Sequence, residues 1–77
     1  MSANPYEKIL DRIVSEIIKE RKKRDISHEK LAKMSGISRS AISFVENRKS
    51  TPTIITCMKI CDALEIRLSE ILQKVDK

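Results

Sequence analysis

Residues 38–48, with the sequence SRSAISFVENR, place side chains that can bind another molecule on the outer face of an expected helix. Ile42 and Val45 are three residues apart, so they share a helix face and can pack against a core. At about 3.6 residues per turn, Phe44 lies on roughly the opposite face, among polar residues. Together with the guanidinium of Arg39, this outer face offers hydrogen-bonding groups and one aromatic ring to a ligand.

The chain lacks the residue combinations that catalysis needs. It has a single histidine, His28, and its two cysteines, Cys57 and Cys61, stand four residues apart on one expected helix face. We assign both cysteines to the core, because two thiols alone do not complete a metal site. The sequence also offers no pairing of a nucleophile with a base and no phosphate-cradling loop. We therefore expect no enzyme activity, no cofactor and no bound metal.

Positive charge is concentrated in the middle of the chain. Residues 19–49 contain ten Lys or Arg and four Asp or Glu, a net charge of +6, whereas the remainder carries −1. A localised basic field attracts a polyanion, either nucleic acid or an anionic membrane. Because no apolar run reaches the length of a membrane span and no signal peptide opens the chain, we expect a soluble, cytoplasmic protein with no membrane partner.

Length and composition favour a single all-α domain over residues 1–77. One Gly, two Pro and 35% charged residues are typical of a small helical protein. Capping residues and prolines divide the chain into five helices. The expected helices cover residues 5–24, 27–35, 38–48, 52–64 and 69–75, with N-caps at Asn4, Ser27, Ser38 and Ser69 and with Pro52 in the first turn of the fourth.

Residues 28–47 resemble the helix-turn-helix of the phage-repressor/Cro-type family. Gly36 stands where the turn requires a positive φ, and the small Ala32 stands where two helices cross closely. The resemblance extends over about residues 17–72, since the stretch PTIITCMKICDALEIRLSEIL is similar to the family's fourth and fifth helices. It implies a compact five-helix, lambda-repressor-like DNA-binding domain whose first helix has an N-terminal extension of about residues 5–16.

The resemblance also implies roles for individual side chains. It pairs Arg21 with Glu46 in a fixed bidentate contact, so we expect both to be structural, as are Gly36 and Ala32. We expect contacts to DNA bases from Arg39, Ser40, Ser43 and Phe44, and contacts to phosphates from Ser27, His28, Ser38, Asn47 and Arg48.

Several positions depart from the family pattern or allow a second interpretation. Phe44 contacts a base or a sugar of DNA; alternatively, its helix is rotated or a partner subunit covers the ring. His28 stands where relatives commonly carry Gln, so it contacts a phosphate or is a solvated residue at a helix end. Most cations in residues 19–24 are expected to be solvated. Asp25 and Glu65 occupy turns where relatives often have Gly. Glu65 either has a left-handed backbone, at a cost of about 1 kcal/mol, or marks a turn of a different shape.

The implied function is that of a sequence-specific transcriptional regulator, most simply a repressor, that binds double-stranded DNA. One module of this size contacts few base pairs, so we expect a homodimer on a palindromic operator. The alternative function is an antitoxin or other protein-interaction module, which binds a toxin or another protein and for which DNA binding is secondary.

Two apolar surfaces are candidates for the dimer interface. The first is C-terminal, because the last expected helix is too short to bury all its apolar residues. The second is the N-terminal half of the first helix, whose apolar band is wider than one neighbouring helix needs. The candidate residues are Ile66, Leu68 and Ile71 on the first surface, and Tyr6, Ile9 and Ile13 on the second.

Overall fold

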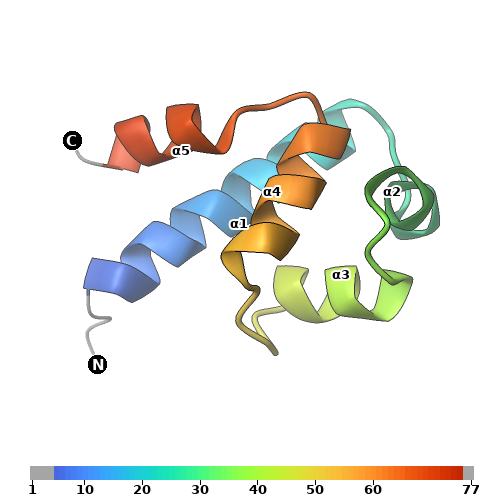
Figure 1. The fold of residues 1–77 in the computed structure, drawn as a ribbon, viewed down its shortest axis with the longest axis horizontal. Coiled ribbons are helices and arrows are strands. Elements are labelled where there is room, and N and C mark those ends of the chain that lie inside the picture. The colour runs from blue at the N-terminus through green and yellow to red at the C-terminus, as the bar shows by residue number, and fades with distance from the viewer. Residues whose placement is uncertain (1–4, 76–77) are drawn as a thin grey trace.

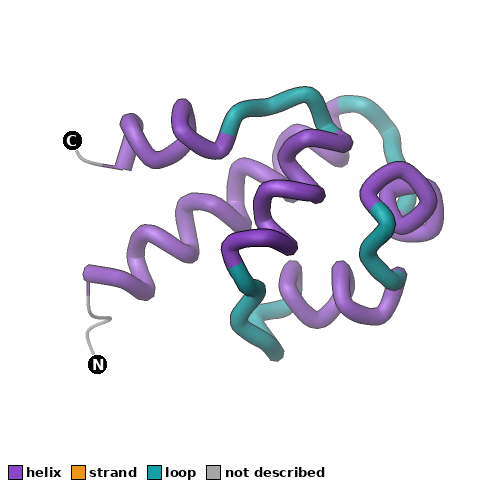
Figure 2. The backbone as a smooth tube through the Cα atoms, viewed as in Figure 1, coloured by secondary structure: helices purple, strands orange, loops and turns teal. Residues whose placement is uncertain are grey.

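The computed structural model describes residues 5–75, which form five α-helices joined by short loops (Figures 1 and 2). The long first helix crosses behind the fourth, the second and third lie together at one end, and the fifth lies at the other end. This arrangement confirms the predicted all-α, five-helix fold. The helices are α1 (Pro5–Lys23), α2 (His28–Ser35), α3 (Arg39–Glu46), α4 (Ile54–Ala63) and α5 (Leu68–Val75).

Serine side chains begin α2 and α3, as the sequence predicts. The Oγ of Ser27 accepts a hydrogen bond from the backbone N–H of Lys30 at 3.0 Å, and the Oγ of Ser38 accepts one from Ala41 at 3.1 Å. Each bond satisfies a backbone donor that has no partner within the helix. The expected N-cap of the first helix, Asn4, lies outside the described residues.

The predicted starts of α4 and α5 are wrong by one or two residues. Thr53 is the N-cap of α4, because its Oγ1 accepts a hydrogen bond from the N–H of Thr56 at 3.1 Å, so Pro52 precedes the helix. At α5, the N–H of Glu70 donates to the carbonyl of Arg67 at 3.0 Å, and the helix begins at Leu68. Ser69 is therefore inside α5 and does not cap it.

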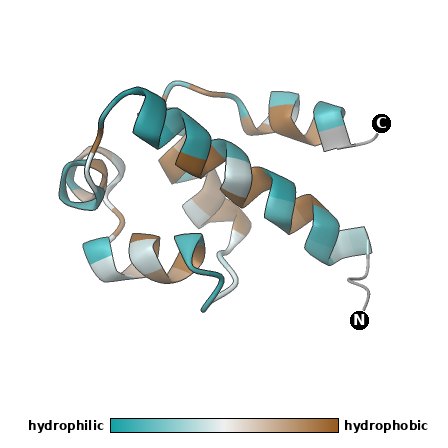
Figure 3. Cartoon of the chain, turned by 180° about the vertical axis from the view of Figure 1, so that it is seen from behind, coloured by the Kyte–Doolittle hydropathy of each residue, from teal (hydrophilic) through white to brown (hydrophobic). Residues whose placement is uncertain are grey.

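The core lies between the helices and receives apolar side chains from each of them. Along α1, hydrophobic and hydrophilic bands alternate, as expected for a helix with one buried side (Figure 3). Burial raises the pKa of the Cys57 thiol, and burial together with the neighbouring Cys57 raises that of Cys61 to about 11, so both thiols are protonated and unreactive at neutral pH. The main buried cluster comprises Ile13, Ile17, Ile26, Leu31, Ile42, Cys57, Ile60, Cys61, Leu64 and Ile71.

The prediction that Ile71 lies on a dimer surface is wrong. Its side chain is only 4% exposed, because α5 packs against α1 and buries this position in the chain's own core. Ile66 and Leu68 are half-buried and pack against the same core. The large apolar side chain that α5 leaves exposed is Leu72.

Within residues 5–75, four turns use a left-handed backbone. Gly36 ends α2 with a φ of 77°, and a Cβ built there would meet nothing within 4 Å, so the backbone angle alone explains the glycine. Asp25 and Glu65 have φ values of 57° and 59°, so of the two alternatives for Glu65 the structure has the left-handed backbone. Arg48, with a φ of 60°, is a fourth such position that the sequence did not indicate.

We expect Glu65→Gly to raise the free energy of unfolding by about 0.5–1 kcal/mol. A left-handed backbone costs an L-residue roughly 1–2 kcal/mol, and the larger unfolded-state entropy of glycine offsets part of that gain. The ion pair of Glu65 with Arg24 is exposed and contributes little. Urea denaturation measures the change, with Lys59→Gly inside α4 as a control that should lose about 1 kcal/mol. Equal losses in both variants would contradict the strain at Glu65.

Candidate nucleic-acid interface

The two sides of α3 have different environments. Ile42 and Val45 are buried and fix the helix to the core, while Arg39 and Ser40 are exposed on the outer side. Phe44 is also on the outer side, with half of its surface (51%) exposed. The core contacts therefore determine the orientation of α3 and leave its polar and aromatic face open.

The polar groups of this face differ in their availability. The Nδ2 of Asn47 donates to the backbone carbonyl of Ser43 at 2.9 Å and to its Oγ at 3.3 Å, so this amide is engaged within its own helix. The hydroxyl of Ser43 accepts from Asn47 and can still donate to a ligand. Within residues 5–75, the side chains of Arg39 and Ser40 have no hydrogen-bond or ion-pair partner. Both are therefore available to contact a ligand directly.

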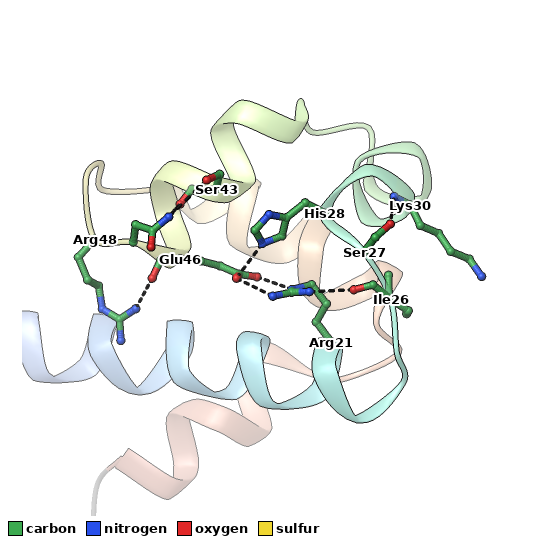
Figure 4. Close-up of polar contacts among 9 residues, drawn as sticks. Arg21, Ile26, Ser27, His28, Lys30, Ser43, Glu46 and Arg48 are labelled. Carbon is green, nitrogen blue, oxygen red and sulfur yellow. Dashed lines mark hydrogen bonds and ion pairs between the residues drawn. The ribbon is translucent and has the colours of Figure 1, made fainter.

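The carboxylate of Glu46, in the last turn of α3, accepts hydrogen bonds from two other helices (Figure 4). Arg21 of α1 binds both of its oxygens, with Nε to Oε2 at 2.7 Å and Nη2 to Oε1 at 2.9 Å. The Nε2 of His28, the first residue of α2, lies 2.9 Å from Oε1. Because an ionised carboxylate only accepts, His28 must carry its proton on Nε2.

This cluster of Arg21, Glu46 and His28 is largely shielded from water. The side chains of Arg21 and Glu46 are 12% and 8% exposed. Burial by itself raises the pKa of Glu46, but the hydrogen bonds from Arg21 and His28 and the positive charge of Arg21 outweigh it and hold the pKa below the usual range of a glutamate. Arg21 also donates through Nη1 to the carbonyl of Ile26 at 2.9 Å, which ties the loop before α2 to the same cluster.

Arg48 points toward α1. Its Nε donates to Asp11 at 2.7 Å, its Nη1 donates to the carbonyl of Glu46 at 3.0 Å, and its Nη2 lies 3.5 Å from the Oγ of Ser15. The ion pair with Asp11 is exposed, with 40% and 68% of the two side chains accessible. For Arg48 to contact a phosphate, its guanidinium therefore exchanges the carboxylate of Asp11 for the phosphate.

The sequence did not indicate two contacts of this region. The bond from His28 to Glu46 joins residues 18 apart, and the ion pair of Arg48 with Asp11 joins residues 37 apart. No local spacing rule relates such positions. The only signal was indirect, since Glu46 lies near the core edge of its helix and requires donors from elsewhere.

A family model of helix-turn-helix proteins matches residues 17–71. The chain belongs to the phage-repressor/Cro-type helix-turn-helix family. It is a DNA-binding transcriptional regulator, and the family is a regulatory one that is not typically enzymatic. The match begins about two thirds of the way along α1, so residues 5–16 of that helix lie outside it. No curated protein matches the chain.

Two further observations concern other classes of site. Within residues 5–75, no group of three or more His, Cys, Asp or Glu side chains is placed to hold a metal ion. In the same part of the chain, every helix is too short or too polar to cross a membrane.

We expect Arg21→Ala to lower the free energy of unfolding by about 3–5 kcal/mol, because it leaves the Glu46 carboxylate shielded without its main partner. The double variant with Glu46→Gln should recover part of this loss, since no uncompensated charge remains. Chemical denaturation of the wild type, both single variants and the double variant measures the coupling. Single losses that simply add would show that the two side chains do not interact.

Proposed function

We propose that the regulator binds a specific double-stranded DNA sequence by inserting the outer face of α3 into the major groove. The observation that carries this proposal is the exposed face of Arg39, Ser40 and Phe44 on a helix whose other side is held in the core. An α-helix fits the major groove, where base edges present hydrogen-bonding groups. The basic middle of the chain, with a net charge of +6 over residues 19–49, supplies the attraction to phosphate.

Within this proposal, the side chains divide into base and phosphate contacts. Arg39 suits guanine, since a guanidinium bonds both O6 and N7, and Ser40 and Ser43 can bond other base edges. The N-cap serines use their oxygens as acceptors within the helices but keep their O–H groups for phosphates. The proposed phosphate contacts are Ser27 and Ser38 in their present geometry, His28 once its second ring nitrogen also carries a proton, and Asn47 and Arg48 after exchange of their present partners.

We also propose that the protein binds as a homodimer through an apolar groove between α4 and α5. The groove is lined by the exposed Ile55, Met58 and Leu72 and by the half-buried Ile66 and Leu68. Residues 54–75 carry three basic and three acidic side chains, so a second copy can approach there without the repulsion expected between two basic surfaces. A dimer bound to a palindromic operator represses most simply by excluding the transcription machinery.

A second candidate function is the binding of another protein, and one observation favours it. A smaller apolar groove lies between the N-terminal half of α1 and the start of α4, and Tyr6 and Ile54 on it are strongly exposed. Part of this groove lies outside the region that the family model matches. If binding another protein is the main function, the purified protein alone should not shift the electrophoretic mobility of the DNA upstream of its gene. The shift would appear only when the partner protein is added.

We expect Arg39→Ala to weaken binding to the preferred duplex by roughly 1–3 kcal/mol while leaving binding to random DNA nearly unchanged. The preferred duplex is obtained by selection from a random library, and affinities are measured at several salt concentrations. Lys74→Ala, which also removes one positive charge but from α5, is the control. Equal losses on both duplexes would make Arg39 a phosphate contact.

We expect Met58→Glu to shift the protein from dimer to monomer in sedimentation at micromolar concentration. Ile54→Glu is the matched control, because Met58 and Ile54 are similarly exposed on α4, at 55% and 59%, but line different grooves. A dimer disrupted only by Ile54→Glu would place the interface at the N-terminal groove. A wild type that stays monomeric on a palindromic duplex would rule out the homodimer.

A further inference from the structure

Phe44 is an exposed apolar residue on the otherwise polar outer face of α3. Its neighbours one turn away on the same helix face are Ser40 and Asn47. It is half exposed, and it lines neither of the two apolar grooves described above. An aromatic side chain in this position contributes little to the core, and it does not continue either candidate protein-binding surface.

The major groove restricts what such a side chain can contact. Base edges there present hydrogen-bond donors and acceptors, except for the methyl group on C5 of thymine, which is apolar. Covering a donor or acceptor with a phenyl ring removes its water without a replacement hydrogen bond, which is unfavourable. Contact with the methyl group has no such cost and removes apolar surface from water.

We infer that Phe44 recognises the C5-methyl group of a pyrimidine itself, whichever pyrimidine carries it. The inference rests on the proposed insertion of α3 into the major groove. Because 5-methylcytosine carries a methyl group on the same ring carbon as thymine, it satisfies the same contact. Affinity for the operator then responds to cytosine methylation at the step that Phe44 faces, while Arg39 and Ser40 recognise polar groups at other steps.

The test compares duplexes that differ by one methyl group. Starting from the selected sequence, each thymine is replaced in turn by deoxyuridine, and the same position is also made cytosine and 5-methylcytosine. At the step that Phe44 faces, the wild type should bind the thymine duplex about fourfold more tightly than the deoxyuridine duplex, and the 5-methylcytosine duplex about fourfold more tightly than the cytosine duplex. Phe44→Ala should remove the difference in both of these comparisons, and Phe44→Leu should retain part of it.

Met34→Ala is the control, because it truncates a similarly exposed apolar side chain on α2 that lines neither groove, and it should keep the full methyl dependence. Binding that is independent of the methyl group at every position, or a dependence that survives in Phe44→Ala, would overturn the inference while leaving DNA binding intact. Absence of salt-sensitive binding to any duplex would instead refute the proposed function, and the inference with it.

Discussion

The carboxylate of Glu46 holds three helices together through polar contacts. A charged side chain with this little exposure is stable only if its acceptor positions are filled. Arg21 supplies two donors from α1 and His28 one from α2, while Glu46 itself belongs to α3. Apolar packing alone permits small rotations of a short helix, whereas these directional bonds determine the position of the C-terminal end of α3 relative to the start of α2.

That constraint accounts for the separation of tasks on the surface. With both ends of α3 fixed, by the Ser38 cap and by Glu46, its inner residues fill the core and its outer residues face away from it. The fifth helix lies at the opposite end of the molecule from α3, beside the apolar groove between α4 and α5 (Figure 1). The proposed contacts with DNA and with a second copy of the chain therefore use different helices and different forces.

Much of this organisation was predictable from local sequence signals. The caps at Ser27 and Ser38, the turn at Gly36 and the buried cysteines depend on neighbouring residues and on helical spacing, which a sequence displays directly. Ile71 was misassigned because its burial depends on how α5 packs against α1, and spacing within α5 does not contain that information.

The same reasoning explains the errors and omissions at the candidate site. A proline marks a helix start to within two residues. The first helical residue is set by the side chain that accepts a hydrogen bond from a free N–H of the first turn, as Thr53 does for α4. The partners of His28 and Arg48 come from distant segments, so their present bonds are set by the tertiary arrangement. The family pattern indicated the pairing of Arg21 with Glu46, and the structure adds the histidine that shares the carboxylate.

The claim that the outer face of α3 contacts DNA is tested most directly by nuclear magnetic resonance. Titration of isotope-labelled protein with the selected duplex should produce the largest amide shift changes in residues 38–47 and at Ser27 and His28. Residues 68–74 of α5 should change only if dimerisation accompanies binding. Changes centred on the groove that contains Tyr6 and Ile54, with α3 unaffected, would contradict the account.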